Sequence, residues 1–139
     1  MSLKVEEVMV KPVLTLSVAS MVKEAVEVMD KNEIGCLVVV HDGTPVVIIT
    51  EKDMLRRVLL EARDPATTKL SQIMSAPIIF GEPKMSIQDV VTLMIQKKIK
   101  KLPILENGQL VGLVTLTDIV RSIAYLEHIL PNLPENTSG

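Results

Sequence analysis

The amino-acid sequence repeats itself at a spacing of 65 residues. Residues 4–58 align without a gap on residues 69–123, and twelve of the aligned positions are identical. The identical residues are Lys4, Met9, Pro12, Val26, Met29, Ile34, Leu37, Gly43, Val46, Thr50, Asp53 and Arg56, each of which recurs 65 residues later. A stacked solenoid needs about three or more shorter repeats. Two copies of this length therefore predict two similar halves packed about a pseudo-twofold axis, with anything bound held between them.

The size and hydropathy of the chain indicate that the halves depend on each other. A unit of about 60 residues is marginally stable alone, so each half is expected to complete the core of the other. The 139 residues are 47% hydrophobic, with a mean hydropathy of +0.36, yet no apolar run approaches the ~20 residues needed to cross a bilayer. An apolar surplus of this kind favours a self-association surface. We therefore expect a homodimer and no membrane partner.

Charge, aromatic content and cysteine content exclude several classes of function. A net charge of −2 and an aromatic content of 1% argue against a nucleic-acid surface, which needs basic patches or stacking rings. The single cysteine, Cys36, excludes an internal disulfide and a cysteine-rich metal site. Nothing resembles a nucleophile with its base, a glycine-rich phosphate loop or a metal cluster, so no enzyme activity is expected. The N-terminus lacks the apolar segment of a signal peptide, which indicates a cytoplasmic location.

Each half predicts the succession β-α-β-β-α, a mixed α/β (α+β) fold. An extended segment ends at Pro12 or Pro77, since proline biases the preceding residue toward extended backbone, and a short strand follows. A helix comes next, with Ser20 or Ser86 as its expected N-cap, the latter in a capping box with Asp89. Apolar residues recur at helical spacing in these segments, namely Val22, Ala25, Val26 and Met29 in the first half and Ile87, Val90, Val91 and Met94 in the second.

Two apolar strands and a final helix complete each half. The strands span residues 36–40 and 45–49 in the first half and 102–105 and 110–114 in the second. Asp42-Gly43 and Asn107-Gly108 predict the hairpin turns, because these dipeptides adopt positive φ at low cost. The final helices begin just after Thr50 and Thr115. The apolar residues expected to face inward from them are Met54, Leu55, Val58, Leu59, Ile119, Val120, Ile123 and Ala124.

These elements divide the chain into a first domain at 5–62, a linker at 63–69, a second domain at 70–126 and a C-terminal tail at 127–139. In each domain an apolar strand, a hairpin turn and a second apolar strand precede a Thr-x-x-Asp motif. The segments that carry this pattern are Ile34–Val40, Thr50–Asp53, Lys101–Leu105 and Val111–Asp118. A tandem of this kind resembles the cystathionine-β-synthase (CBS) domain pair, over nearly the whole chain.

The resemblance implies a regulatory module without catalytic activity. In that family, the clefts between paired domains bind AMP, ADP, ATP or S-adenosylmethionine, and the pair regulates another protein. No further cofactor is required, and the regulated partner is not identifiable from this sequence.

The two Thr-x-x-Asp motifs, Thr50 with Asp53 and Thr115 with Asp118, have two interpretations. Such a motif is itself a capping-box sequence, in which the side chains satisfy the backbone of their own helix. In the context of the resemblance, the same residues bind a nucleotide. A carboxylate at a helix start would repel phosphate, but it can accept charge-assisted hydrogen bonds from ribose hydroxyls. The aspartates are therefore the expected ribose ligands, and the threonine hydroxyls can reach a phosphate or ribose oxygen.

The resemblance also assigns the remaining residues of the two clefts. Asp53 is expected to share a cleft with Lys100, Lys101 and Leu102, and Asp118 with Thr15, Gly35, Cys36 and Leu37. Gly112 and Thr117 belong to the same set, Gly112 because a glycine three residues before the threonine lets a ligand approach closely. Val47 stands at the equivalent position of the first half and departs from the family pattern.

Several of these residues have a plainer structural interpretation. Lys97, Lys98, Lys100 and Lys101 follow a helix, where the dipole favours cations without any ligand. Cys36 suits a role as a small buried apolar residue. Phe80 can flank an adenine or belong to the core. For the whole chain, the alternative function is a structural dimerisation module whose clefts bind no nucleotide.

Overall fold

The computed structural model describes residues 3–74 and 77–126 of the chain, so the predicted tail at 127–139 lies outside the described residues. The chain forms two compact units. Within the described part of the chain, one unit contains 3–13 and 79–126, and the other contains 14–74 with 77 and 78. Among the described residues, no helix has the length and hydropathy needed to cross a membrane.

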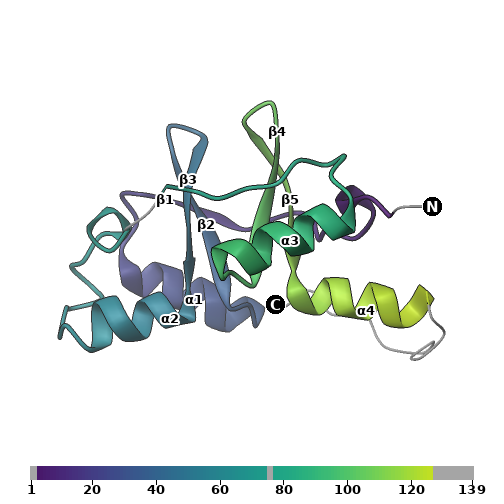
Figure 1. Ribbon diagram of the computed structural model, residues 1–139. Coiled ribbons are helices and arrows are strands. Elements are labelled where there is room, and N and C mark those ends of the chain that lie inside the picture. The colour runs from purple at the N-terminus through teal and green to yellow at the C-terminus, as the bar shows by residue number, and fades with distance from the viewer. Residues whose placement is uncertain (1–2, 75–76, 127–139) are drawn as a thin grey trace. The chain divides into compact units, whose positions relative to one another are not determined.

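The unit Leu14–Ile78 contains a three-stranded sheet in the order β1-β2-β3 (Figure 1). Strand β1 pairs parallel with β2, and β2 pairs antiparallel with β3. The elements are β1 (Thr15–Ser17), α1 (Val22–Asn32), β2 (Cys36–His41), β3 (Thr44–Thr50), α2 (Glu51–Asp53), the π-helix η2 (Met54–Leu59) and the 3-10 helix η3 (Leu70–Gln72).

The other unit has the same plan around a two-stranded antiparallel sheet. Its elements are the 3-10 helix η1 (Val5–Glu7), α3 (Ile87–Lys97), β4 (Lys101–Glu106), β5 (Gln109–Thr115) and α4 (Leu116–Leu126). A single parallel bridge between Gly81 and Ile104 takes the place that β1 has beside β2. On the outer edge, Val10 and Leu113 exchange two backbone hydrogen bonds of 2.8 and 3.0 Å.

The gap-free repeat seen in the sequence is confirmed in the backbone. The bounds of α1, β2 and β3 recur 65 residues later in α3, β4 and β5. Both hairpins carry an irregularity at the same place, between Val39 and Val40 and between Ile104 and Leu105. The predicted turns are also present, with positive φ at both residues of Asp42-Gly43 and of Asn107-Gly108. The mixed α+β fold is therefore confirmed. The β-α-β-β-α succession is confirmed in the first repeat, whereas the strand predicted after Pro77 in the second repeat is wrong, because only the isolated Gly81–Ile104 bridge forms there.

The compact units exchange the N-terminal segments of the two sequence repeats. Val5, from the first repeat, is fully buried in the core of the second, where its amide donates to the carbonyl of Met85. Leu70, at the equivalent position of the second repeat, is fully buried in the core of the first, and its amide donates to the carbonyl of Ser20. Each compact unit therefore consists of most of one sequence repeat together with the N-terminal segment of the other.

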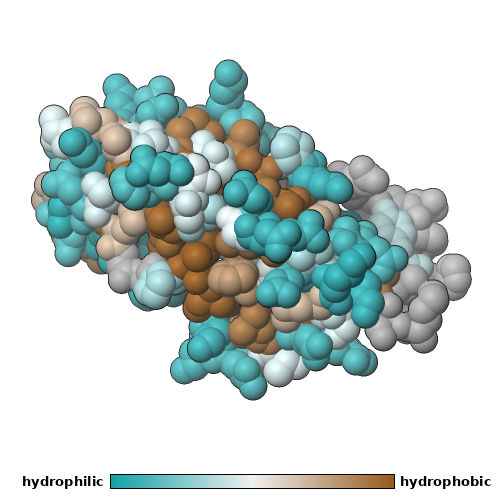
Figure 2. Space-filling model, turned by 90° about the horizontal axis from the view of Figure 1, so that it is seen from above, coloured by the Kyte–Doolittle hydropathy of each residue, from teal (hydrophilic) through white to brown (hydrophobic). Residues whose placement is uncertain are grey.

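Each unit has its own apolar core, which lies between its sheet and its helices. Residues of α1, β2 and β3 form one core, and residues of α3, β4 and β5 form the other. The largest fully buried side chains of these elements are Leu37, Ile49, Met94, Leu102 and Ile104. Apolar side chains also reach the surface among hydrophilic ones, on the face that Figure 2 shows.

The predicted helix caps are half correct. Ser86 caps α3, because its Oγ accepts a 3.1 Å hydrogen bond from the amide of Asp89, but α3 has this cap without the reciprocal bond of the predicted capping box. The prediction for Ser20 is wrong, because α1 begins after Met21 and no side chain caps it. The free amides of its first turn instead donate to carbonyls of the segment that leads to η3: Val22 to Thr68 and Lys23 to Pro65. This long-range solution leaves no local signal in the sequence.

The prediction that all apolar residues of the final helices face inward is wrong. Met54 packs against one core, and Val58 and Ile119 are buried. Apolar residues on another face of each helix are 36–80% exposed, and we call these sets the outer stripes: Leu55, Leu59 and Leu60 in one unit and Leu116, Val120 and Ile123 in the other. A helix that covers a sheet buries only one stripe of its surface. The two helices therefore carry more apolar surface than their own units can cover.

Candidate functional site

Thr50 and Asp53 form a closed pair at the junction of β3 and α2. The amide of Thr50 donates a 2.8 Å hydrogen bond to Oδ2 of Asp53, and the threonine hydroxyl lies 3.2 Å from the same oxygen. The amide of Asp53 donates in return to Oγ1 of Thr50 at 3.4 Å. These bonds form because a strand that turns directly into a helix leaves free amides at the turn.

Thr115 and Asp118 form the same pair between β5 and α4. The amide of Thr115 donates to Oδ2 of Asp118 at 3.0 Å, and the amide of Asp118 donates to Oγ1 of Thr115 at 3.1 Å. Both residues are buried, whereas Thr50 and Asp53 are only half-buried. The capping interpretation of the two motifs is therefore confirmed, and in both pairs the aspartate contributes Oδ2 to the cap.

Each pair lies beside the loop that precedes the first strand of its own hairpin. In one unit, the amide of Glu51 donates to the carbonyl of Gly35, and Cys36 is the register partner of Thr50. In the other, the amide of Leu116 donates to the carbonyl of Lys100, and Lys101 is the register partner of Thr115. The strand order places these residues together, because the start of the first hairpin strand always faces the end of the second.

The predicted site residues consequently gather in two groups. Thr15, Gly35, Cys36, Leu37, Thr50 and Asp53 lie in one unit, and Lys100, Lys101, Leu102, Gly112, Thr115, Thr117 and Asp118 lie in the other. Leu37 and Leu102 are core residues with fully buried side chains, and Cys36 is buried as well. Thr15, Lys100 and Thr117 are exposed. The predicted pairing of each aspartate with the loop of the other repeat stays a prediction.

Residue 112 is a glycine that packs against the side chain of Met9. Its neighbour Leu113 is joined to Val10 by backbone hydrogen bonds, and this places Met9 against Gly112. A Cβ atom at residue 112 would overlap Sδ of Met9 and would lie 2.7 Å from its Cγ. The predicted approach of a ligand to this glycine stays a prediction, since the close contact that the structure shows is made by Met9. Val47, at the equivalent position, is a buried core residue.

Arg57 lies beside Asp53, and it was not predicted as a site residue from the sequence. Its Nε lies 3.6 Å from Oδ1 of Asp53, and its Nη1 lies 3.4 Å from the carbonyl oxygen of Ile73, to which it donates. The available signal was the spacing of four residues between aspartate and arginine, which places both side chains on one helix face. The equivalent residue of the second repeat is Ser122.

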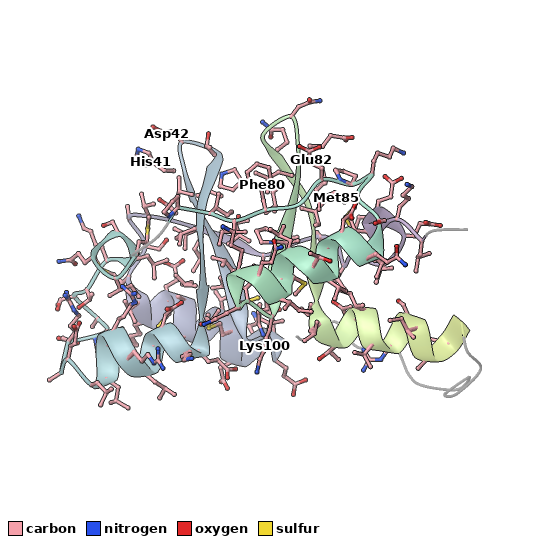
Figure 3. All side chains as sticks on the ribbon, viewed as in Figure 1. His41, Asp42, Phe80, Glu82, Met85 and Lys100 are labelled. Carbon is pink, nitrogen blue, oxygen red and sulfur yellow. The ribbon has the colours of Figure 1, made fainter. Side chains whose placement is uncertain are left out.

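Phe80 lies on the segment beside β4 and is 44% exposed, so the core interpretation of this residue is wrong (Figure 3). Gly81, which follows it, packs against Leu102 and Ile104 instead. Figure 3 also shows Lys100 at the base of β4, and His41 with Asp42 at the tip of the other hairpin. The side chain of Phe80, the one phenylalanine of the sequence, is therefore partly exposed to solvent.

The sequence aligns with those of known proteins over most of its length. The chain is 34% identical over 115 residues to the CBS domain-containing protein YhcV of Bacillus subtilis, covering 83% of this chain and 81% of that protein. It is 36% identical over 127 residues to an uncharacterized protein of Methanopyrus kandleri, covering 90% of this chain and 65% of that protein. The second relative is therefore longer than the region it shares with this chain.

Solved structures agree with this similarity. A CBS-domain protein of Burkholderia ambifaria superposes with a TM-score of 0.81 at 28% identity, covering 98% of this chain and 100% of that one. A CBS domain pair in complex with 5′-methylthioadenosine and S-adenosyl-L-methionine also superposes with a TM-score of 0.81, at 25% identity, covering 89% of this chain and 98% of that one.

The family model of the CBS domain matches the chain twice, at residues 5–60 and at residues 70–125. These matches include both Thr-x-x-Asp motifs and both hairpins. Paired CBS domains are regulatory ligand-binding modules. With two matches that follow one another, and with structural neighbours of the same kind, the chain belongs to the CBS domain family as a tandem CBS domain pair.

Proposed function

We propose that this CBS pair is a ligand-sensing regulatory module that binds an adenine nucleotide or an adenosyl ligand and passes the signal to a partner protein. AMP, ADP, ATP and S-adenosylmethionine are the candidate ligands. The proposal rests on one observation, the two strand-to-helix junctions Thr50–Asp53 and Thr115–Asp118. At each junction an aspartate carboxylate caps the start of the helix. A related CBS pair was solved with two adenosyl compounds bound, which supports the same ligand class here.

The capping role of the aspartates is compatible with ribose binding. Each cap uses Oδ2 of the carboxylate, and a carboxylate can accept about four hydrogen bonds in total. Oδ1 can therefore accept from the two neighbouring hydroxyls of a ribose while Oδ2 holds the backbone. Such charge-assisted bonds contribute about 1.5–3 kcal/mol each, and burial of Asp118 strengthens them.

The other residues have distinct proposed roles in ligand binding. Lys100 and Lys101 supply cations for a phosphate, as point charges without the bidentate grip of arginine. Gly35, Cys36, Leu37 and Leu102 contribute backbone groups, because the side chains of the last three are buried. Thr15 and Thr117 contribute exposed hydroxyls.

The proposal is tested by ligand-induced changes in thermal unfolding. The wild type should be stabilised by at least one of the candidate ligands, by about 2.7 kcal/mol at one hundred times its Kd. Asp53→Asn combined with Asp118→Asn should abolish the effect, because the amide keeps a carbonyl for the cap but loses the charge that ribose hydroxyls need. Asp89→Asn is the matched control, since Asp89 also occupies the first turn of a helix. An unchanged wild-type transition with every candidate ligand would refute the proposal.

The outer stripes support a homodimer as the assembly of the module. Six apolar side chains on the final helices are exposed, and Leu116, Val120 and Ile123 follow the spacing of one helix face. Exposed apolar surface of this extent marks an interaction site, and a second copy of the chain presents a surface of the same chemistry.

A structural dimerisation module is the second candidate function. It is favoured by one observation, namely that both aspartates already have a complete structural role as caps. This candidate predicts a stable dimer whose thermal unfolding is insensitive to every adenine ligand, so the same melting series separates the two.

A further inference from the structure

We propose that the ring of Phe80 stacks on the base of the bound nucleotide, on one face of the sheet formed by β4 and β5. The inference rests on the proposed function and deepens it, since it names the side chain that recognises the base. Thr15 stands at the equivalent position of the first repeat and has no ring, so stacking of this kind belongs to one repeat only.

The alternation of side chains places Phe80 outside the core. Ile79 packs against the core of its unit. A Cβ atom at Gly81 would lie 3.0 Å from Cδ2 of Leu102 and would therefore point toward the same core, as its 3.2 Å distance from Cδ1 of Ile104 also indicates. Phe80 stands between these two inward-facing positions and is 44% exposed (Figure 3). Because successive side chains of an extended segment point to opposite faces, its ring lies on the face that the core does not use.

Two residues of the proposed site share this face with Phe80. Lys101 and Thr115 are register partners at the ends of β4 and β5. The residues beside them in their strands, Leu102 and Val114, are buried in the core. Lys101 and Thr115 therefore point away from the core, as Phe80 does.

The spacing along this face suits a nucleotide. Phe80 lies beside Pro103, because Gly81 and Ile104 form a parallel bridge. Lys101 precedes Pro103 by two residues, which is about 7 Å along a strand. A ribose separates the base of a nucleotide from its phosphate by a comparable length. The base can therefore lie on Phe80 while the ammonium of Lys101 contacts the phosphate.

Pro103 also weakens the attachment of the Phe80 segment to the sheet. In the other unit, the amide of Val38 donates to the carbonyl of Leu14 beside the ladder of β1 and β2. The equivalent residues are Pro103 and Ile79, and proline has no N–H to donate. The segment that carries the ring lacks this hydrogen bond, so it can shift toward a base at lower cost.

The first test compares AMP with ribose 5-phosphate, which is the same ligand without its base. Stacking of one base on an aromatic side chain corresponds to an affinity loss of about five- to 150-fold on alanine substitution. Phe80→Ala should weaken AMP binding by this factor in calorimetry and leave the affinity for ribose 5-phosphate unchanged, whereas Phe80→Tyr should bind AMP as the wild type does. Urea unfolding without ligand should change little in Phe80→Ala, because the ring lies outside the core.

The second test uses the absence of tryptophan from the sequence. Phe80→Trp introduces a single indole, and its emission should be quenched as AMP, ADP, ATP or S-adenosylmethionine saturates the protein and the adenine stacks on it. Ile95→Trp is the matched control, since Ile95 is 69% exposed on α3 of the same unit, and its emission should not respond.

Three results would overturn the inference. Phe80→Ala can leave AMP binding unchanged, or it can weaken the binding of AMP and ribose 5-phosphate equally, and either result removes the base contact. It can also lower the mass in light scattering while AMP binding stays intact, which would make Phe80 a contact between protein copies. Saturable AMP binding by the wild type separates these results from failure of the proposed function, in which no candidate ligand binds and the inference falls with it.

Discussion

The amide of Thr115 donates a 3.0 Å hydrogen bond to Oδ2 of Asp118, and the amide of Asp118 returns a 3.1 Å hydrogen bond to Oγ1 of Thr115. Both residues are buried, so neither amide can turn to water if its partner is removed. Thr50 and Asp53 form the same kind of pair, but these two residues are only half-buried.

Asp118→Ala is therefore expected to destabilise the protein more than Asp53→Ala. Loss of the carboxylate leaves the buried Thr115 amide without an acceptor, which costs about 1–3 kcal/mol. The Thr50 amide is part-buried and can recover a hydrogen bond to water, so the second loss is smaller. Urea unfolding without ligand measures both values. Asp118→Asn, which keeps a carbonyl at this position, should restore most of the stability, and an equal loss in the two alanine variants would contradict the argument.

Gly112→Ala is expected to destabilise the unit that contains β5, by about 1–3 kcal/mol, because its Cβ would overlap the side chain of Met9. The double variant Met9→Ala with Gly112→Ala should lose less than the sum of the two single variants, since the alanine at residue 9 removes the overlapping atoms. A double-mutant cycle in urea unfolding measures this coupling. Additive losses would show that Met9 does not set the requirement for glycine.

Val5→Ala is expected to destabilise the second repeat although Val5 belongs to the first repeat in sequence. The side chain is fully buried among Val90, Met94 and Leu102, and removing its two methyl groups costs about 2 kcal/mol. Hydrogen exchange should show the loss of protection in β4 and β5 first. Leu70→Ala is the reciprocal variant and should affect β2 and β3 first, at about 2–5 kcal/mol. The opposite assignment of the two effects would contradict the segment exchange.

Much of this fold could be predicted because it is repeated. A single Asp-Gly or Thr-x-x-Asp sequence is weak, but Asp42-Gly43 and Asn107-Gly108 recur in register with Thr50 and Thr115, and all of them have the predicted structure. Local signals of this kind depend on backbone groups a few residues away, which are visible in sequence.

The features that could not be predicted depend on contacts distant in the chain. The amides at the start of α1 are satisfied by Pro65 and Thr68, and Gly112 is matched to Met9, which is more than one hundred residues away. Arg57 was missed for a different reason, since the first repeat has it and the second does not. Comparison of repeats finds what they share, whereas the chemistry that distinguishes two sites lies in the residues that differ.

Val120→Glu and Leu59→Glu are expected to convert the proposed homodimer to monomer, because each places a charge in an outer stripe that would be buried between copies. Light scattering at micromolar concentration measures the mass. Gln88→Glu is the control, since it adds the same charge to an exposed position of α3. A monomeric wild type, or variants that stay dimeric, would contradict the proposed surface.

Lys84 provides a pH-dependent test of the segment exchange. Its Nζ donates a 2.8 Å hydrogen bond to Oε1 of Glu6, which joins the N-terminal segment to the loop before α3. This hydrogen bond, together with the negative charge of Glu6, raises the pKa of Lys84 above its ordinary value of 10.5. A lysine whose pKa is raised by folding stabilises the folded state fully below the unfolded pKa and loses that contribution as the pH rises through the folded pKa.

The stability difference between wild type and Lys84→Gln should therefore be constant from neutral pH up to about pH 10 and should vanish above the raised pKa. Urea unfolding at pH 8 and at a series of pH values rising from pH 10 measures the difference, which is expected to be small because the pair is exposed to solvent. Lys23→Gln, at an exposed lysine without an ion pair among the described residues, corrects for the general effect of charge at high pH. If the difference did not decrease anywhere in this series, the contribution of Lys84 would come from its alkyl chain and not from its charge.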